Sequence, residues 1–144
     1  MADRISNNAA DFSRSLMAMS DYATQGMEKV IRKACIDLYR RIAKRTPFET
    51  GRAKANWSIS VGTPDTSIKD QTDYVSEIAR QVSGFKFDVH DGMVYITNNL
   101  EYIEKLETGY SRRQAPNGMV AVSLAEFTTH FNNELQGLEG IRPL

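Results

Sequence analysis

Cysteine is almost absent from this chain, with one residue, Cys35, among 144. A lone cysteine cannot form an internal disulfide, so nothing in the sequence points to an oxidising compartment. Long apolar runs are absent too, and no stretch approaches the roughly 20 residues that a membrane-spanning helix needs. Residues 1–4 lack the basic-then-apolar pattern of a secretory signal. We therefore expect synthesis in the cytoplasm and no membrane partner.

Motifs for catalysis or cofactor binding are also scarce. Neither of the usual glycine-rich phosphate loops occurs. The nearest approach to a metal cluster is His90 with Asp88 and Asp91, but His130 is 40 residues away and no second ligand pair is close in the sequence. Cys35 has no base or oxyanion element beside it, and its place at the border of an apolar stripe suits a small buried side chain. The sequence predicts no enzyme, no metal and no cofactor.

A group of carboxylates follows the segment near residue 100. Glu101, Glu104 and Glu107 are spaced by three residues, so neighbouring members lie on one face of a helical segment. Such pairs can perform general acid–base chemistry, but a solvated helix face explains them without it. We interpret all three as surface residues.

Charge is unevenly distributed, although the formal net charge is zero. Nine of the 18 Lys and Arg residues lie between Lys29 and Lys54, with two of the 18 Asp and Glu residues, so the rest of the chain is acidic. A bipolar subunit suits stacking against copies of itself or an oppositely charged partner. A solvated basic helix face and direct DNA binding are the alternatives. The basic residues concerned are Arg40, Arg41, Lys44, Arg45, Arg52 and Lys54, with a second site at Arg112 and Arg113.

Hydrophobic periodicity predicts an α+β domain. The predicted elements are a helix at 9–45 that bends or breaks near Gly26, a strand at 57–61, a helix at 73–82, a hairpin formed by 85–89 and 93–98, a helical turn at 102–109 and a helix at 119–135. Apolar residues keep helical spacing in the first and last helices, at Met27, Ile31, Ala34, Leu38 and Ile42 and at Val120, Leu124, Phe127 and Phe131.

All of these apolar stripes can be buried if the long N-terminal helix and the C-terminal helix pack against one small antiparallel sheet. We therefore expect a single domain over residues 1–144, with flexible ends at 1–8 and 138–144. The length fits one domain with a substantial core.

An elbow is predicted where the basic helix gives way to the first strand. Proline disfavours the helical region for the residue before it, and glycine permits a backbone conformation closed to other residues. We expect the residues that follow to run into an extended segment. The positions that define the elbow are Thr46, Pro47, Thr50, Gly51 and Arg52, followed by Asn56 and Trp57.

A second segment, beginning at residue 98, combines a short amphipathic turn with isolated glycines. Tyr102 and Leu106 lie on its apolar side, Glu107 follows, and Gly109 ends it. An exposed polar loop at 110–114 comes next. Pro116 and Gly118 then lead into the last helix.

Together these two segments resemble the signatures of tail-completion proteins of long-tailed bacteriophages, a family that includes head–tail connector, neck and minor tail components. The pattern Thr46-Pro47-x-x-Thr50-Gly51-Arg52 is similar to the first signature. The series from Asn98 through Tyr102, Leu106 and Glu107 to Gly109 is similar to the second. The resemblance covers about residues 27–132, although 62–85 carry no signature.

The resemblance implies a virion structural protein that acts without chemistry. Members form a ring at the top of the tail. Because the tail has six-fold symmetry, we expect the ring to contain six or twelve copies. The ring lies between the head connector and the tail terminator or tail tube, and the genome DNA passes through its centre. Tail terminator and capsid-proximal adaptor are neighbouring roles, and a small DNA-binding module is the alternative from another class. The candidate surface residues for protein or DNA are Arg40, Arg41, Lys44, Arg45, Arg112 and Arg113.

Overall fold

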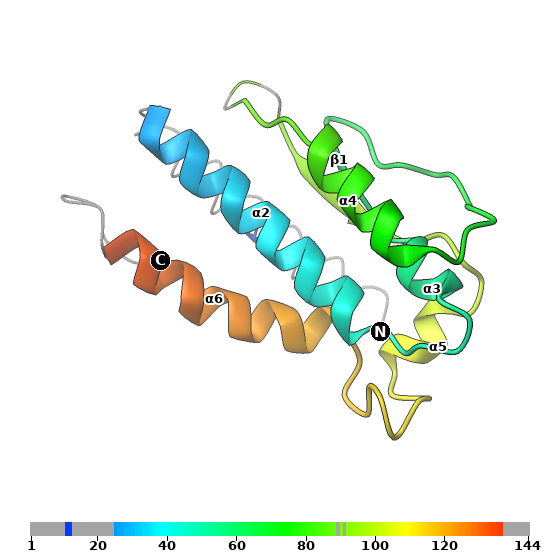
Figure 1. Ribbon diagram of the computed structural model, residues 1–144. Coiled ribbons are helices and arrows are strands. Elements are labelled where there is room, and N and C mark those ends of the chain that lie inside the picture. The colour runs from blue at the N-terminus through cyan, green and yellow to red at the C-terminus, as the bar shows by residue number, and fades with distance from the viewer. Residues whose placement is uncertain (1–10, 13–24, 89, 91, 137–144) are drawn as a thin grey trace.

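A computed structural model of the chain describes residues 11–12, 25–88, 90 and 92–136 (Figure 1). The elements, in chain order, are α2 (Gln25–Arg45), α3 (Arg52–Ala55), β1 (Ser58–Val61), α4 (Tyr74–Gly84), β2 (Val94–Thr97), α5 (Ile103–Glu107) and α6 (Val120–Gln136). Helices pack against a two-stranded antiparallel sheet, so the predicted α+β class is confirmed. The expected flexible ends and the predicted helical residues 13–24 lie outside the described residues.

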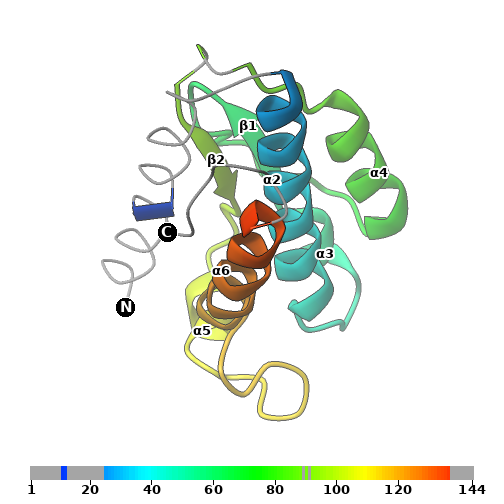
Figure 2. The same ribbon diagram turned by 90° about the vertical axis from the view of Figure 1, so that its left-hand side faces the viewer.

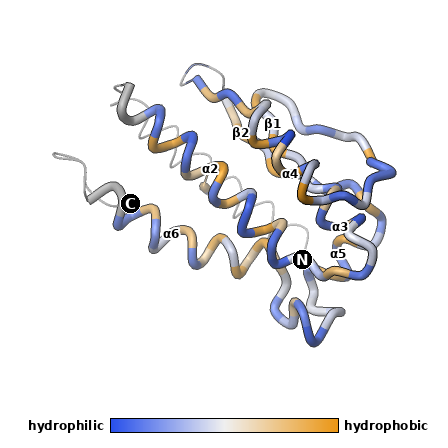
Figure 3. The backbone as a smooth tube through the Cα atoms, viewed as in Figure 1, coloured by the Kyte–Doolittle hydropathy of each residue, from blue (hydrophilic) through white to orange (hydrophobic). Residues whose placement is uncertain are grey.

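Helix α2 is the centre of the arrangement. Helix α6 runs along one side of it, and α3 and α4 contact its other side (Figures 1 and 2). Helix α2 places hydrophobic and hydrophilic residues alternately along its length, as expected for a helix with one buried stripe (Figure 3). The predicted interruption at Gly26 falls in the first turn of α2, so the described part of this helix continues unbroken to Arg45.

The core lies between α2, α6 and the sheet. The predicted apolar stripes are confirmed at the eight positions whose burial the structure describes, all 9% exposed or less, whereas the burial of Met27 lies outside the description. Their members in α2 are Ile31, Ala34, Leu38 and Ile42, and those in α6 are Val120, Leu124, Phe127 and Phe131. Burial of this apolar surface is the main stabilising contribution in a domain of this size.

The sheet differs from the predicted one. Strand β2 pairs with β1, in register from Ser58 opposite Thr97 to Val61 opposite Val94. The predicted hairpin between 85–89 and 93–98 is therefore wrong, since the described residues 85–88 form no strand. Phe85 is instead buried in the core, so its apolar side chain is removed from water although residue 85 pairs with no strand.

The segment after the elbow is also corrected. Residues 52–55, which we expected only to lead into the strand at 57–61, form the short helix α3. The strand then begins at Ser58, as predicted to within one residue. The outer edge of β1 is covered by α4, because the Ile59 N–H donates to Gln81 Oε1 at 3.1 Å.

Candidate functional site

The elbow is fastened to the end of α2 by a chain of buried hydrogen bonds. Trp57 Nε1 donates to Thr46 Oγ1 at 2.7 Å, and Thr46 Oγ1 donates to the Ile42 carbonyl at 2.8 Å. The Tyr39 hydroxyl donates to the Trp57 carbonyl at 3.1 Å. Thr46 and Trp57 are 2% and 4% exposed. These bonds fix the angle between helix and strand, because a buried polar group that loses its partner is costly.

Lys54 closes the end of α2 from the other side of the elbow. Its amine donates to the carbonyls of Ala43 and Lys44 at 3.1 and 2.7 Å. These carbonyls are among those that a helix C-terminus leaves without partners, and a cation is favourable there. Burial, and then the charge of Lys44, lowers the pKa of Lys54. Lys54 is thus a buried capping residue, and the prediction that it belongs to a basic surface cluster is wrong.

Gly51 lets the elbow pack against the loop that precedes α4. Its φ is 92°, and a Cβ at this position would lie 2.4 Å from the Thr72 carbonyl oxygen. The Arg52 N–H donates to Thr50 Oγ1 at 3.2 Å, which stabilises the turn into α3. Pro47 is buried at the start of the elbow. The predicted elbow residues therefore have structural roles in one compact turn.

The second segment is organised by Glu107, which caps the last helix. One carboxylate oxygen accepts from the Met119 and Val120 N–H groups, both at 2.8 Å, and the other accepts from Ala121 N–H at 3.1 Å. These amides begin α6, where a negative charge is favourable. Glu107 is 5% exposed, so our interpretation of it as a surface residue is wrong. Its contacts lie 12 to 14 residues away in the sequence, too far for a local capping pattern to indicate.

The glycines of the second segment permit this cap. Gly109 and Gly118 have φ of 89° and 82°. A Cβ on Gly109 would lie 2.4 Å from the Pro116 carbonyl oxygen, and one on Gly118 would lie 2.2 Å from the Glu107 carbonyl oxygen. The chain thus returns to the start of α6 by approaching its own backbone at two points.

The two segments meet in space. The Phe48 N–H donates to Gln114 Oε1 at 2.6 Å, and Gln114 Nε2 donates to the Phe48 carbonyl at 3.0 Å. Beside this pair of bonds lies a cleft of about 520 Å³ between the elbow and α5. The predicted residues that line it are Pro47, Thr50, Gly51 and Arg52 from the elbow and Tyr102 and Leu106 from the second segment. We call this contact between residues 46–57 and 102–118 the joint.

Two of the predicted basic residues form ion pairs within the subunit. The Arg45 guanidinium binds the Glu126 carboxylate of α6, and Arg41 Nη1 lies 3.6 Å from the same carboxylate. Both pairs are partly exposed, so they contribute little to stability and serve mainly to orient side chains between α2 and α6. Sequence reasoning did not anticipate them, because Glu126 is distant in the chain.

The other four basic candidates are exposed: Arg40, Lys44, Arg112 and Arg113. No side-chain partner occurs for any of them in the part of the chain that the structure describes. Arg40 and Lys44 are one turn apart on α2, and Arg112 and Arg113 lie in the loop between α5 and α6. The structure therefore separates them into two exposed basic sites.

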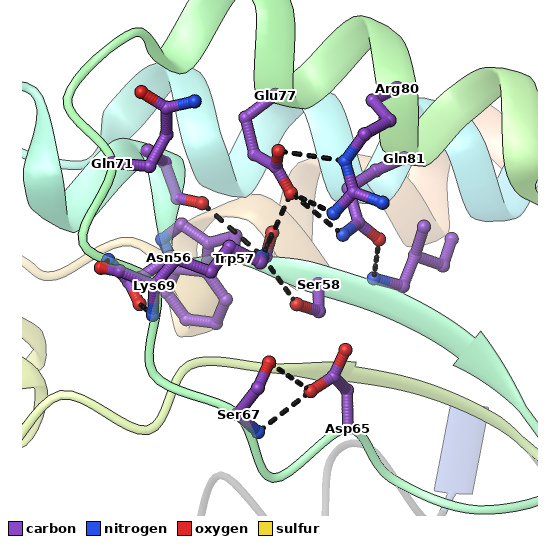
Figure 4. A network of polar contacts seen from close by, with 12 residues as sticks. Asn56, Trp57, Ser58, Asp65, Ser67, Lys69, Gln71, Glu77, Arg80 and Gln81 are labelled. Carbon is purple, nitrogen blue, oxygen red and sulfur yellow. Dashed lines mark hydrogen bonds and ion pairs between the residues drawn. The ribbon is translucent and has the colours of Figure 1, made fainter.

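A polar network that the sequence analysis missed joins α4 to β1 (Figure 4). Arg80 donates to Glu77 through two nitrogens, at 2.9 and 2.5 Å, and Lys69 Nζ lies 3.3 Å from the same carboxylate. Lys69 Nζ also donates to Ser58 Oγ at 2.7 Å. The hydrogen bonds from Arg80 lower the pKa of Glu77 to about 2. The spacing of Glu77, Arg80 and Gln81 on one helix face was the available signal.

The residues weighed for metal binding or catalysis have ordinary surroundings. Across the described segments, no three His, Cys, Asp or Glu side chains are grouped as a metal site would require. His90 is exposed, and its backbone N–H donates to Asp88 Oδ1 at 2.8 Å, while Asp91 lies outside the described residues. Cys35 is buried, and desolvation raises the pKa of its thiol to about 12. A thiol in that state is a poor nucleophile.

Two further findings bear on what the chain is. None of the helices in the described segments combines the length and apolar character needed to cross a bilayer. Comparison with known proteins finds no matching family model, no similar curated protein and no similar solved structure.

Proposed function

We propose that this chain is a virion structural protein of a long-tailed bacteriophage, forming a ring at the head–tail junction. The ring completes the tail and joins it to the DNA-filled head, with the genome passing through its lumen. Its partners are copies of itself, the head connector on one side and the tail terminator or tail tube on the other. It acts by shape and charge complementarity.

The joint is the observation that carries this proposal. The two segments that resemble the family signatures are distant in the sequence, yet they contact each other through Phe48 and Gln114, which are 66 residues apart. The signature residues occupy positions that admit few substitutes. Gly51 and Gly118 have positive φ, a Cβ added to either would lie within 2.4 Å of a backbone oxygen, and Glu107 binds three amides. A shared signature is expected where packing is this restrictive.

The surface around the joint also suits assembly. Phe48 and Tyr110 are 50% and 73% exposed, and Tyr102 is 38% exposed. Large apolar side chains exposed beside a cleft are typical of surfaces that bind another protein. A ring needs such surfaces on two different faces of the subunit, because each copy contacts its neighbours through unlike patches.

Electron microscopy of lysates from a phage with this gene disrupted tests the proposal. Filled heads lying apart from tails of finished length are the expected result. Tails of abnormal length would place the protein at the neighbouring layer, as a tail terminator. Intact infectious particles would overturn the structural role.

The loop at 110–114 supplies a sharper prediction within the same phage. We expect the double substitution Arg112→Glu and Arg113→Glu to block tail joining, because both guanidinium groups are exposed in a loop beside the joint. The substitution Lys29→Glu with Lys86→Glu is the control, since it makes the same change in net charge at exposed sites elsewhere. Normal joining by the Arg112 and Arg113 variant would exclude this loop from the interface.

A small DNA-binding module remains the second candidate, favoured by the exposed cations Arg40, Lys44, Arg112 and Arg113. Affinity for duplex DNA that falls steeply with added salt would support it, because each neutralised phosphate releases counterions. Weak retention that salt does not change would count against it.

A further inference from the structure

A second cleft, of about 640 Å³, lies at the C-terminal end of α2. It is lined by α2, by the start of the elbow, by Lys54 of α3 and by Gln114. Asp37 is the one carboxylate among its lining residues. The five cations in its wall are Arg40, Arg41, Lys44, Arg45 and Lys54.

The charges of this cleft are unequally compensated. Arg41 and Arg45 contact Glu126, and Lys54 binds the two carbonyls at the end of α2. For Arg40 and Lys44, by contrast, the described chain supplies no side-chain partner. Among the described residues, therefore, two cations of this cleft have no ion-pair partner, and Asp37 is the one carboxylate in the wall, which favours a carboxylate ligand that both cations can bind.

An acidic counterpart occurs on the same chain. Outside residues 29–54 the sequence has nine Lys and Arg residues against sixteen Asp and Glu residues. Glu101, two residues before α5, and Glu104, in its first turn, are both exposed and have no side-chain partner among the described residues. Their spacing of three residues puts both carboxylates within reach of one cationic site.

The two patches are distinct parts of the surface. The cleft lies at the C-terminal end of α2 and includes Lys54 of α3, whereas Glu101 and Glu104 lie just before α5 and in its first turn. Figure 1 shows α5 next to α3, on the same side of the α2 and α6 pair. Two unlike patches at different places on the subunit are what a head-to-tail contact between copies requires.

We propose that this cleft receives Glu101 and Glu104 of a second copy of the chain. Arg40 and Lys44 of one subunit bind the α5 carboxylates of the next, and repetition of this head-to-tail contact closes the ring. The inference rests on the proposed function and identifies the subunit interface within it. A second copy is favoured over DNA because the described chain leaves two cations of this cleft without a partner, which is few for a duplex, whose binding proteins commonly make about 6–10 phosphate contacts.

Two charge-reversal variants test the contact. The first carries Arg40→Glu and Lys44→Glu, and the second carries Glu101→Lys and Glu104→Lys. Sedimentation velocity of each purified protein should show loss of the wild-type assembly, because like charges now oppose each other at every interface. The double substitution Lys29→Glu and Lys86→Glu, at exposed sites, should leave assembly unchanged.

An equimolar mixture of the two variants makes the test specific. The acidic cleft of the first variant faces the basic α5 of the second, and the basic cleft of the second faces the acidic α5 of the first. Assembly should therefore return only in the mixture, as a ring with an even number of alternating copies. A chain carrying all four substitutions should also assemble, since both patches exchange sign.

Three outcomes would overturn the inference. Assembly of either variant alone would show that this contact is not the interface, as would a wild-type chain that stays monomeric up to about 1 mM. Loss of salt-dependent DNA retention by the first variant, with its assembly intact, would assign the cleft to nucleic acid. These results are separate from the test of the proposed function, because separated heads and tails in the gene-disrupted phage do not depend on which patch joins the copies.

Discussion

Two helices of this protein end against a buried charge supplied by another segment, and the two charges have opposite signs. Lys54 binds two carbonyls at the C-terminus of α2. Glu107 binds three amides at the N-terminus of α6. Each sign matches the partial charge that the helix dipole places at that end.

The surroundings of the two caps differ. Lys54 lines the cleft at the end of α2, where water can replace its amine at the carbonyls. Glu107 is held under Gly118, where an added Cβ would lie 2.9 Å from the carboxylate as well as 2.2 Å from the Glu107 carbonyl oxygen. We therefore expect a charged cap to contribute most where the backbone around it leaves no room for water.

The largest effect is expected from Gly118→Ala. Alanine would have to adopt the left-handed backbone conformation of Gly118, and its methyl group would collide with the Glu107 backbone. We expect a loss of about 4 kcal/mol in the free energy of unfolding, from backbone strain together with the displaced cap. Urea denaturation followed by circular dichroism measures it.

Two other glycines separate the causes of that loss. Gly92 has a φ of 90°, but a Cβ added there would meet no atom within 4 Å, and Gly84 has neither constraint. Gly92→Ala should therefore cost about 1 kcal/mol from backbone strain alone. Gly84→Ala should cost nothing. Equal effects at Gly118 and Gly92 would show that the Glu107 contact is unimportant.

Removal of the carboxylate itself comes next. Glu107→Ala leaves amides at the start of α6 without their acceptor, and we expect it to cost about 3 kcal/mol. Glu49→Ala, at an exposed side chain of the elbow, should stay within about 0.5 kcal/mol of wild type. Denaturation curves of the two variants, measured side by side, give the difference. A small loss at Glu107 would mean that water reaches these amides.

Periodicity predicted the helices well and the sheet partly. The stripe from Ile31 to Ile42 and the stripe from Val120 to Phe131 are confirmed, because burial of one helix face leaves its mark at fixed spacing in the sequence. The hairpin failed because alternation and a turn dipeptide indicate strands without specifying their partners. Strand β2 pairs with β1, which precedes it by more than 30 residues.

The sequence predicted the residues of the joint but not the contacts between them. The glycines and Glu107 were identified by resemblance, but their physical roles depend on contacts between distant segments. Gly118 is restricted by Glu107, and Phe48 is bound by Gln114. Periodicity reports which face of an element is buried, and it does not report which backbone group approaches another.

Glu77 provides a third buried charge, and a second buried carboxylate, that sharpens the comparison, because side chains rather than backbone amides bind it. Arg80 lowers its pKa from 4.5 to about 2, so its stabilising contribution is present above pH 4.5 and is lost as the pH falls toward 2. We expect Glu77→Gln to cost about 2 kcal/mol at pH 7, since the exposed side of Arg80 is screened by water. The difference from wild type should shrink in acid.

Denaturation at a series of pH values between 7 and 2.5 follows this loss. Glu49→Gln is the matched control, because it removes the same charge at an exposed side chain. A Glu77→Gln curve parallel to that of wild type throughout would contradict the ion pair with Arg80.

The smallest effect is expected at the other helix cap, with Lys54→Met. Methionine keeps most of the apolar stem and removes the amine, so two carbonyls of α2 lose their donor. Burial already disfavours the charged amine, as its lowered pKa indicates, so its removal also relieves a cost. Water entering the cleft can bind the freed carbonyls. We therefore expect a net loss of about 1 kcal/mol, and no change for the exposed Lys86→Met. Urea denaturation of both variants decides the matter: a loss at Lys54 as large as that at Glu107 would mean that the cleft excludes water as fully as the start of α6 does.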